Sequence, residues 1–260
     1  MAAERRIAGK CARAACVVPD AVPFAAALWG ALAGAEAASR VAPPGRVACS
    51  RFAAAARWMQ ALVHPEGLDI LPLRRIVRAQ AGGPERLADA VIKFDASPWG
   101  GGAALFVGGA PSEYFAATWS PEVCALFRAE IGVPKYQTFW EYLTVFLALC
   151  VWGDAYRAEA VTVAGDNVPA LEGALNLKGK SLLNHVTREL AWRRARRRWS
   201  YVVAHLPAEH NITADALSRL AAPVPAAFAG ELALAKQVAA PAIAELFVTM
   251  RAPPGRQRAP

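Results

Sequence analysis

The chain has 260 residues, a formal net charge of +8 and a pI near 9.6. That length provides one sizeable domain and part of a second, and a hydrophobic fraction of 55% supports a buried core. The basic excess favours a polyanion as partner, although charge alone is weak evidence. The five cysteines form no CxxC pair, which argues against structural zinc and indicates reduced thiols in an intracellular compartment, cytoplasmic or nuclear.

The N-terminal third is predicted to be helical after a poorly ordered basic segment over residues 1–20. An uncharged run over 21–35 resembles a signal peptide, but prolines and Asp20 interrupt its start and it is too short to span a bilayer. We therefore predict a soluble helix and no membrane partner. Residues 21–83 form a small helical segment in this prediction, with helices over 23–38 and 50–64, a short basic stretch over 71–78 and a glycine-rich linker over 81–84.

The pattern changes to strands after residue 87. Apolar runs predict strands at 91–95, 103–107 and 112–119, joined by tight turns. The first turn contains Gly100, Gly101 and Gly102, which are expected to supply positive φ angles, and Gly108-Gly109 forms the second. Three strands joined in this way predict an antiparallel meander.

The second half alternates helices and strands. The strongest helix pattern covers 138–152, and a strand apolar on both faces follows at 160–164. Helices at 168–175 and 181–199, the latter capped by Ser181, precede a strand at 201–206 and a helix at 213–220. Residues 222–260 read as an Ala/Pro-rich tail, with a helix around 228–238 and a disordered end over 252–260. The fold class is therefore α/β, a mixed five-stranded sheet flanked by helices.

Four acidic residues occupy positions where burial is costly. Asp95 ends the first strand, Glu141 lies inside the apolar helix, Asp166 follows the strand at 160–164, and Asp215 lies in the first turn of the last helix, with Asn211 or Thr213 as its cap. Carboxylates placed in this way are costly to bury unless they share a cation. Glu113, Glu122 and Glu130 also lie between Asp95 and Asp166, but only Glu141 lies in a strongly apolar helix.

Four segments together resemble the ribonuclease H domain that follows reverse transcriptase in retrotransposons. They are Phe94–Gly100, Trp140-Glu141, Gly165–Asn167 and, most specifically, Asn211-Ile-Thr-Ala-Asp-Ala-Leu-Ser-Arg219. The resemblance covers about residues 89–221, which implies a ribonuclease H-like fold there. Residues 21–83 more weakly resemble the connection between polymerase and ribonuclease H. Because no Tyr-x-Asp-Asp motif occurs, the chain resembles the C-terminal part of a larger polyprotein or a truncated copy.

The resemblance implies a metal-dependent endoribonuclease that cleaves the RNA strand of RNA–DNA hybrids. Asp95 would bridge two Mg²⁺ ions, for which Mn²⁺ could substitute, Glu141 and Asp166 would complete one site, and Asp215 would complete the other. His210 lies in the loop where some cellular relatives carry a histidine that helps product release. The polymerase part of the same retroelement is the implied protein partner.

Six arginines on the helix over 181–199 are expected to bind the phosphate backbone of the hybrid, because few acids balance them. They are Arg188, Arg193, Arg194, Arg196, Arg197 and Arg198. Asn167 either shapes its loop or contacts the nucleic-acid backbone. A solvated helix face is the competing interpretation of the arginines, and a solvent-exposed loop residue that of His210.

Three other functions remain open from the sequence. The domain could be an inert nucleic-acid-binding module, a truncated retroelement remnant without activity, or a DNA nuclease on the same fold. Retention of all four acids favours the nuclease, because binding alone does not require them.

Overall fold

The computed structural model describes residues 2–39, 46–63, 87–227 and 230–250. Its strands are β1 Leu87–Ala96, β2 Gly100–Val107, β3 Ala110–Thr118, β4 Ala160–Gly165, β5 Tyr201–His205 and β6 Lys236–Gln237. Its α-helices are α1 Ala2–Val17, α2 Val22–Ser39, α3 Arg46–Val63, α4 Pro121–Phe127, α5 Gln137–Trp152, α6 Val168–Asn176, α7 Leu183–Arg197, α8 Ile212–Ser218 and α9 Ile243–Leu246. The expectations for 71–78, 81–84 and 252–260 lie outside the described residues.

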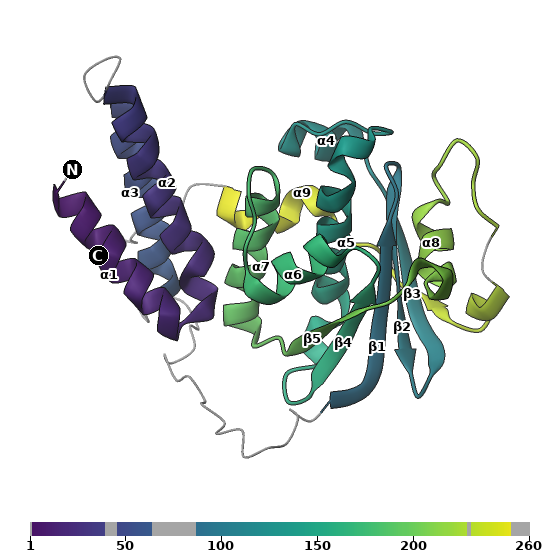
Figure 1. Ribbon diagram of the computed structural model, residues 1–260. Helices are drawn as coiled ribbons and strands as arrows, with labels where there is room; N and C mark the ends of the chain where they lie inside the picture. The colour runs from purple at the N-terminus through teal and green to yellow at the C-terminus, as the bar shows by residue number, and fades with distance from the viewer. Residues whose placement is uncertain (1, 40–45, 64–86, 228–229, 251–260) are drawn as a thin grey trace, which may run out of the picture.

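The sheet has the strand order β5-β4-β1-β2-β3-β6. β1, β2 and β3 form the predicted antiparallel meander, whereas β4 and β5 run parallel to β1. Helices α5, α6 and α7 cover one side of the sheet and α8 packs against β1 and β2 on the other (Figure 1). The predicted α/β class, a mixed sheet flanked by helices, is confirmed.

A sixth strand extends the predicted five. Residues 236–237 pair in parallel with Glu113 and Tyr114 of β3, at the edge of the sheet. Further along, Ile243 and Phe247 are buried, and the Phe247 ring lies edge-on to Phe127 with centroids 4.7 Å apart. The described part of the Ala/Pro-rich segment is therefore packed on the domain. The helix expected around 228–238 does not form over its described part, where a short 3-10 turn and β6 occur instead.

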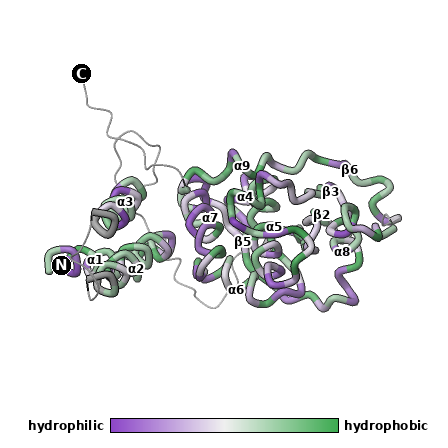
Figure 2. The backbone as a smooth tube through the Cα atoms, turned by 90° about the horizontal axis from the view of Figure 1, so that it is seen from above, coloured by the Kyte–Doolittle hydropathy of each residue, from purple (hydrophilic) through white to green (hydrophobic). Residues whose placement is uncertain are grey.

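The N-terminal helices form a small layer against α7. Residues 1–20 were expected to lack order, but α1 is a regular helix because its alanines favour helix and allow close packing: Ala8 is fully buried in a cluster with Leu28 and Leu32 of α2. Figure 2 shows α1, α2 and α3 beside α7. Trp192 of α7 meets Trp58 of α3 edge-on, with centroids 5.2 Å apart.

The start of α7 differs from the prediction. Ser181 has a φ of +50° and does not cap the helix, which begins at Leu183 after a residue with no capping side chain. Helix α4 was not predicted, although its signal is present: Ser120 accepts a hydrogen bond from the Val123 amide at 3.3 Å and Pro121 takes the first position. None of the described helices is long and apolar enough to cross a bilayer.

Candidate active site

Three of the four acidic residues converge at the carboxyl ends of two adjacent parallel strands. Asp95 is the penultimate residue of β1, Asp166 directly follows β4, and Glu141 projects from the second turn of α5, which packs on β1. One oxygen of each carboxylate lies within 4.8 Å of the other two. Of the acids between Asp95 and Asp166, Glu113 instead accepts a hydrogen bond from Trp152.

Asp215 lies next to this cluster on α8 but is not part of it. Its Oδ1 pairs with Arg219 at 2.7 Å, one turn further along the helix. The carboxylate is close enough to Asp95 to contribute to the rise in that residue's pKa. The structure thus brings Asp95, Glu141 and Asp166 together and holds Asp215 beside them in an ion pair.

Burial raises the pKa of Asp95 to about 7, and repulsion from Asp166 and Asp215 adds to the rise. Two groups oppose it: Ser218 Oγ donates a hydrogen bond to Asp95 Oδ2, and the Arg219 charge favours the ionised form. Only 7% of Asp95 is exposed, so water does little to stabilise its charge.

The pKa of Glu141 is raised further than that of Asp95, because only 2% of Glu141 is exposed. Burial, followed by repulsion from Asp95, raises its pKa to about 9, against the lowering effect of the Gln137 hydrogen bond. Gln137 Nε2 donates to Glu141 Oε1 at 2.8 Å and also to the Ala96 carbonyl, so one amide links α5 to the end of β1. Glu141 Oε2 is buried and has no hydrogen-bond partner within the part of the chain that the structure describes.

The donor set fits a divalent metal ion. Three carboxylates within ligand distance of one another repel, and an unsatisfied buried oxygen costs free energy unless a partner compensates it. A hard cation with oxygen ligands, such as Mg²⁺, would compensate both costs. Asp95, Glu141 and Asp166 are the residues that would hold it.

Glycines in β2 allow two helices to approach the site. Gly100, Gly101 and Gly102 were expected to supply a turn with positive φ, but they lie within the strand and none has a positive φ. A Cβ on Gly102, the residue paired with Asp95, would lie 2.3 Å from Leu217 Cβ of α8. A Cβ on Gly101 would lie 2.2 Å from Thr144 Oγ1 of α5. The glycines are therefore required for close approach. Gly108 and Gly109 do form the expected turn with positive φ.

Polar residues between α8 and β1 position the site, and the sequence analysis gave them no such role. Ser97 Oγ donates to the Ser218 carbonyl at 2.7 Å. Asn211 caps no backbone amide of α8; its Nδ2 instead donates to the Phe94 carbonyl at 2.8 Å, next to Asp95. Ser97, Asn211 and Ser218 lie in two of the segments that carry the family resemblance. That position is the sequence signal from which their role could have been inferred.

Three of the six arginines at α7 bond to residues of the N-terminal or C-terminal segments. Arg188 donates to the Thr249 carbonyl at 2.9 Å, Arg193 pairs with buried Glu189 at 2.9 Å and donates to Leu246, and Arg194 pairs with Asp20 at 2.6 Å. The expectation of unbalanced charge does not hold for Arg193 and Arg194, because Glu189 on the same helix and the distant Asp20 balance them, whereas Arg188 is bonded to a backbone carbonyl. They attach the C-terminal segment and the N-terminal helices to α7.

The remaining arginines lie away from the acidic cluster of Asp95, Glu141 and Asp166. Arg196 lies over the Trp192 ring, and exposed Arg197 pairs with Asp154 at 3.1 Å. Asp154 follows α5, and Glu141 lies near the start of that helix, so the rise along the helix separates them by roughly 20 Å. Arg198 ends α7 with a φ of +59° and is exposed. The structure does not bring these arginines to the acidic cluster.

Asn167 and His210 lie closer to the site in the fold. Asn167 Oδ1 accepts a hydrogen bond from the Ala170 amide at 3.0 Å and caps α6, directly after Asp166. This contact agrees with the loop-shaping interpretation. His210 is exposed in the turn before α8.

No family model matches the chain, and no curated protein matches it. The solved structures to which it is similar include ribonuclease H1 from the halophilic archaeon Halobacterium salinarum NRC-1, with 16% identity and a TM-score of 0.38 over 51% of this chain and 94% of that one. Another is LC11-RNase H1 in complex with an RNA/DNA hybrid, with 17% identity and a TM-score of 0.38 over 49% and 92% of the two chains. Likeness at this level carries no argument about activity.

Proposed function

We propose that this chain is a metal-dependent endoribonuclease that cleaves the RNA strand of RNA–DNA hybrids. The observation that carries the proposal is the convergence of Asp95, Glu141 and Asp166, with an unsatisfied buried oxygen on Glu141. A site of this kind is costly to maintain in a protein that only binds nucleic acid. The motif over residues 211–219 supports the further proposal that the domain belongs to a retroelement reverse transcriptase and acts beside its polymerase.

The residues of the site have separate roles in this proposal. Asp95, Glu141 and Asp166 would hold one Mg²⁺ ion. Asp95 and Asp215 would contribute to holding a second, and Asp215 would then leave its ion pair with Arg219. Bound metal supplies an activated water and stabilises the leaving oxygen of the phosphodiester. Ser218 and Gln137 orient Asp95 and Glu141. We propose that the exposed His210 assists product release.

The hybrid contacts the protein through its backbone. No base-reading element is evident in the sequence, so we expect cleavage with little sequence preference and recognition of the RNA strand through its 2′-hydroxyl groups. Asn167 beside Asp166, together with Arg196, Arg197 and Arg198 at the end of α7, are the proposed contacts. The internally paired Arg188, Arg193 and Arg194 support this surface indirectly.

The test is a cleavage assay with labelled RNA–DNA hybrid, RNA duplex and DNA duplex in Mg²⁺. Wild type is compared with Asp95→Asn and with Glu130→Gln, which removes an exposed carboxylate outside the site. Cleavage of the hybrid alone, lost in Asp95→Asn and retained in Glu130→Gln, supports the proposal. Hybrid binding without cleavage by wild type would favour the inert nucleic-acid-binding module, and cleavage of DNA duplex would favour the DNA nuclease.

A further inference from the structure

Most of the basic excess lies in residues 2–63, which include the three N-terminal helices. Residues 2–63 contain eight Lys or Arg residues against three Asp or Glu residues, a net charge of +5 out of +8 for the whole chain. In the rest of the chain, several arginines of α7 are already paired with carboxylates. A polyanion attracted by this charge would therefore meet the N-terminal helices as well as the sheet domain.

One face of α1 gathers three of these cations. Arg6, Lys10 and Arg13 follow one another at intervals of four and three residues, which places them on the same side of a helix, and all three are exposed. The opposite side carries Ala8 and Ala15, which are buried, and α1 packs there against α2. The cationic face thus points away from the rest of the protein.

Among the residues that the structure describes, no carboxylate forms an ion pair with Arg6, Lys10 or Arg13. Of the three acids in residues 2–63, Asp20 is engaged by Arg194 at 2.6 Å and Glu4 is half-buried. Cations stacked one turn apart repel one another by roughly 0.2–0.5 kcal/mol per pair. A phosphate backbone would replace this repulsion by attraction and gain from the release of counterions.

The end of α1 leads to α7 through residues 19–21, which contact that helix. Asp20 lies three residues beyond the end of α1 and pairs with Arg194, and exposed Arg197 and Arg198 follow within about one helical turn. The two sets of cations therefore lie on either side of the same ion pair. This junction is at the far end of α5 from Glu141.

We propose that the face of α1 formed by Arg6, Lys10 and Arg13 is a second nucleic-acid-binding surface, which holds the phosphate backbone of a duplex that extends beyond the catalytic cluster. The proposal rests on the proposed function only for the choice of a duplex as ligand. Contacts to phosphates alone carry no sequence information, so the surface should bind hybrid and DNA duplexes alike.

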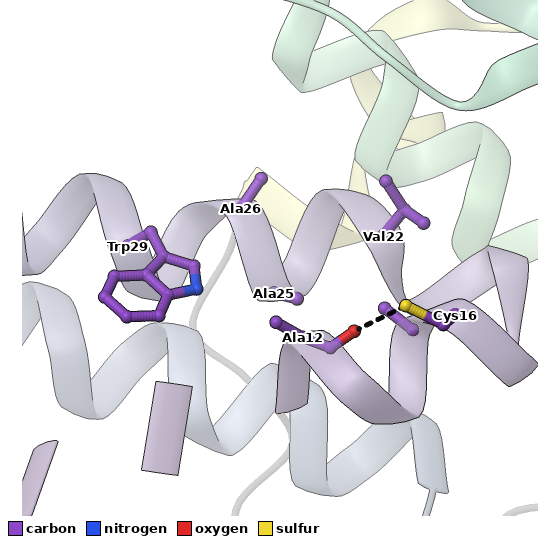
Figure 3. A pocket seen from close by; sticks show the side chains of 7 residues that line it. Ala12, Cys16, Val22, Ala25, Ala26 and Trp29 are labelled. Carbon is purple, nitrogen blue, oxygen red and sulfur yellow. Dashed lines mark hydrogen bonds between the residues drawn. The ribbon is translucent and has the colours of Figure 1, made fainter. Parts of the chain in front are cut away.

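A membrane surface is the competing ligand for a basic helix, but here the side of α1 with Ala8 and Ala15 is covered by α2. The large apolar side chains of α1 that stay exposed, Ile7 and Val17, lie ten residues apart along the helix and form no continuous stripe. An apolar groove does lie between these helices, where Ala12 and Cys16 of α1 face Ala25 and Trp29 of α2 (Figure 3). Its lining contains no charged side chain, so phosphate contacts fall to the basic face.

The test measures binding of a 24-base-pair hybrid and a 24-base-pair DNA duplex by the full chain over a range of salt concentrations. Asp95→Asn serves as background to prevent cleavage. The triple variant Arg6→Gln/Lys10→Gln/Arg13→Gln is compared with Lys135→Gln/Arg157→Gln/Lys236→Gln, which removes the same charge from exposed cations that pair with carboxylates elsewhere. Helix content by circular dichroism checks that both variants fold.

The α1 variant is expected to weaken binding of both duplexes by at least about tenfold near 0.1 M salt and to reduce the slope of log K against log salt by about 2–3. The control variant should change the slope by less than about 1. Equal slopes for the two variants would overturn the proposal, as would loss of binding to phosphatidylserine vesicles with duplex binding unchanged. In the catalytically intact chain, hybrid cleavage at saturating substrate should be the same with and without the α1 substitutions. Binding and cleavage are measured separately. A wild type that binds duplex through α1 but does not cleave would therefore refute the proposed function and not this inference.

Discussion

Ser218 Oγ lies 2.5 Å from Asp95 Oδ2 and joins α8 to β1 across 123 residues of chain. The hydroxyl oxygen also lies 2.9 Å from the Asp215 carbonyl, an alternative acceptor for its single proton, and the Ser218 carbonyl accepts a hydrogen bond from Ser97. The last helix and the first strand of the sheet domain therefore share one hydrogen-bonded junction at the acidic cluster.

Ser218→Ala should lower hybrid cleavage by roughly 10- to 100-fold, because the orientation of a metal-ligating carboxylate depends on its hydrogen-bond partner. The expected loss of unfolding free energy is only about 1 kcal/mol. Cleavage rates and chemical denaturation measure the two effects. Ser120→Ala, which removes the cap of α4, is the control: it should cost similar stability and leave cleavage unchanged. Equal activity in the two variants would contradict the role of Ser218.

Glu141→Gln should stabilise the metal-free protein at neutral and alkaline pH. The pKa values of Asp95 and Glu141 are raised to about 7 and about 9, so both acids bind protons more tightly in the folded than in the unfolded state, where ordinary values are about 4. Stability is therefore unaffected by these groups below about pH 4 and falls as pH rises through the folded values.

Thermal unfolding in EDTA across pH 5–9 measures this effect. We expect Tm of wild type to decline with pH, a shallower decline for Glu141→Gln, and recovery of wild type, but not of the variant, on adding Mg²⁺. Parallel curves for the two proteins in EDTA would show that Glu141 carries no such cost.

Gly102→Ala should strongly destabilise the sheet domain, by about 2 kcal/mol or more, because the new Cβ would overlap Leu217 and the Ser218 amide. Gly30→Ala in α2 is the control, since nothing lies within 4 Å of the added Cβ and alanine favours helix. Denaturation midpoints should separate the two variants. A Gly102→Ala protein as stable as Gly30→Ala would contradict the close approach of α8 to β2.

A double-mutant cycle on Asp20 and Arg194 should give a coupling free energy on the order of 1–2 kcal/mol, because both side chains are about one-fifth exposed and only partly screened. Limited proteolysis provides a second readout: Arg194→Ala should speed cleavage between α1 and α2. Arg197→Ala, which removes a more exposed pair with Asp154, should leave that cleavage unchanged. A coupling near zero would mean that the N-terminal helices are held by apolar packing alone.

Most element types between residues 87 and 220 were predictable because hydrophobic periodicity is local. The apolar runs around Asp95 and Asp166 identified two buried strands, and a lone acid in the apolar helix distinguished Glu141 from its neighbours in sequence. The role of Gly102 was not predictable, because the strand conformation of a glycine in a turn-like sequence depends on α8 packing against it. The partner of Arg194 lies 174 residues away, and the pairing of distant side chains depends on tertiary packing that no local pattern encodes.

The attachment of both chain ends to α7 has a consequence for where this protein can be shortened. A fragment limited to residues 89–221 would remove the Thr249 amide that bonds to Glu189, a carboxylate with no exposed surface, and would uncover Trp192 where α3 now covers it. Such a fragment would carry every residue of the acidic cluster, yet it should express poorly and aggregate. Soluble fragments of this protein should therefore retain the helices before the sheet and the segment through Met250.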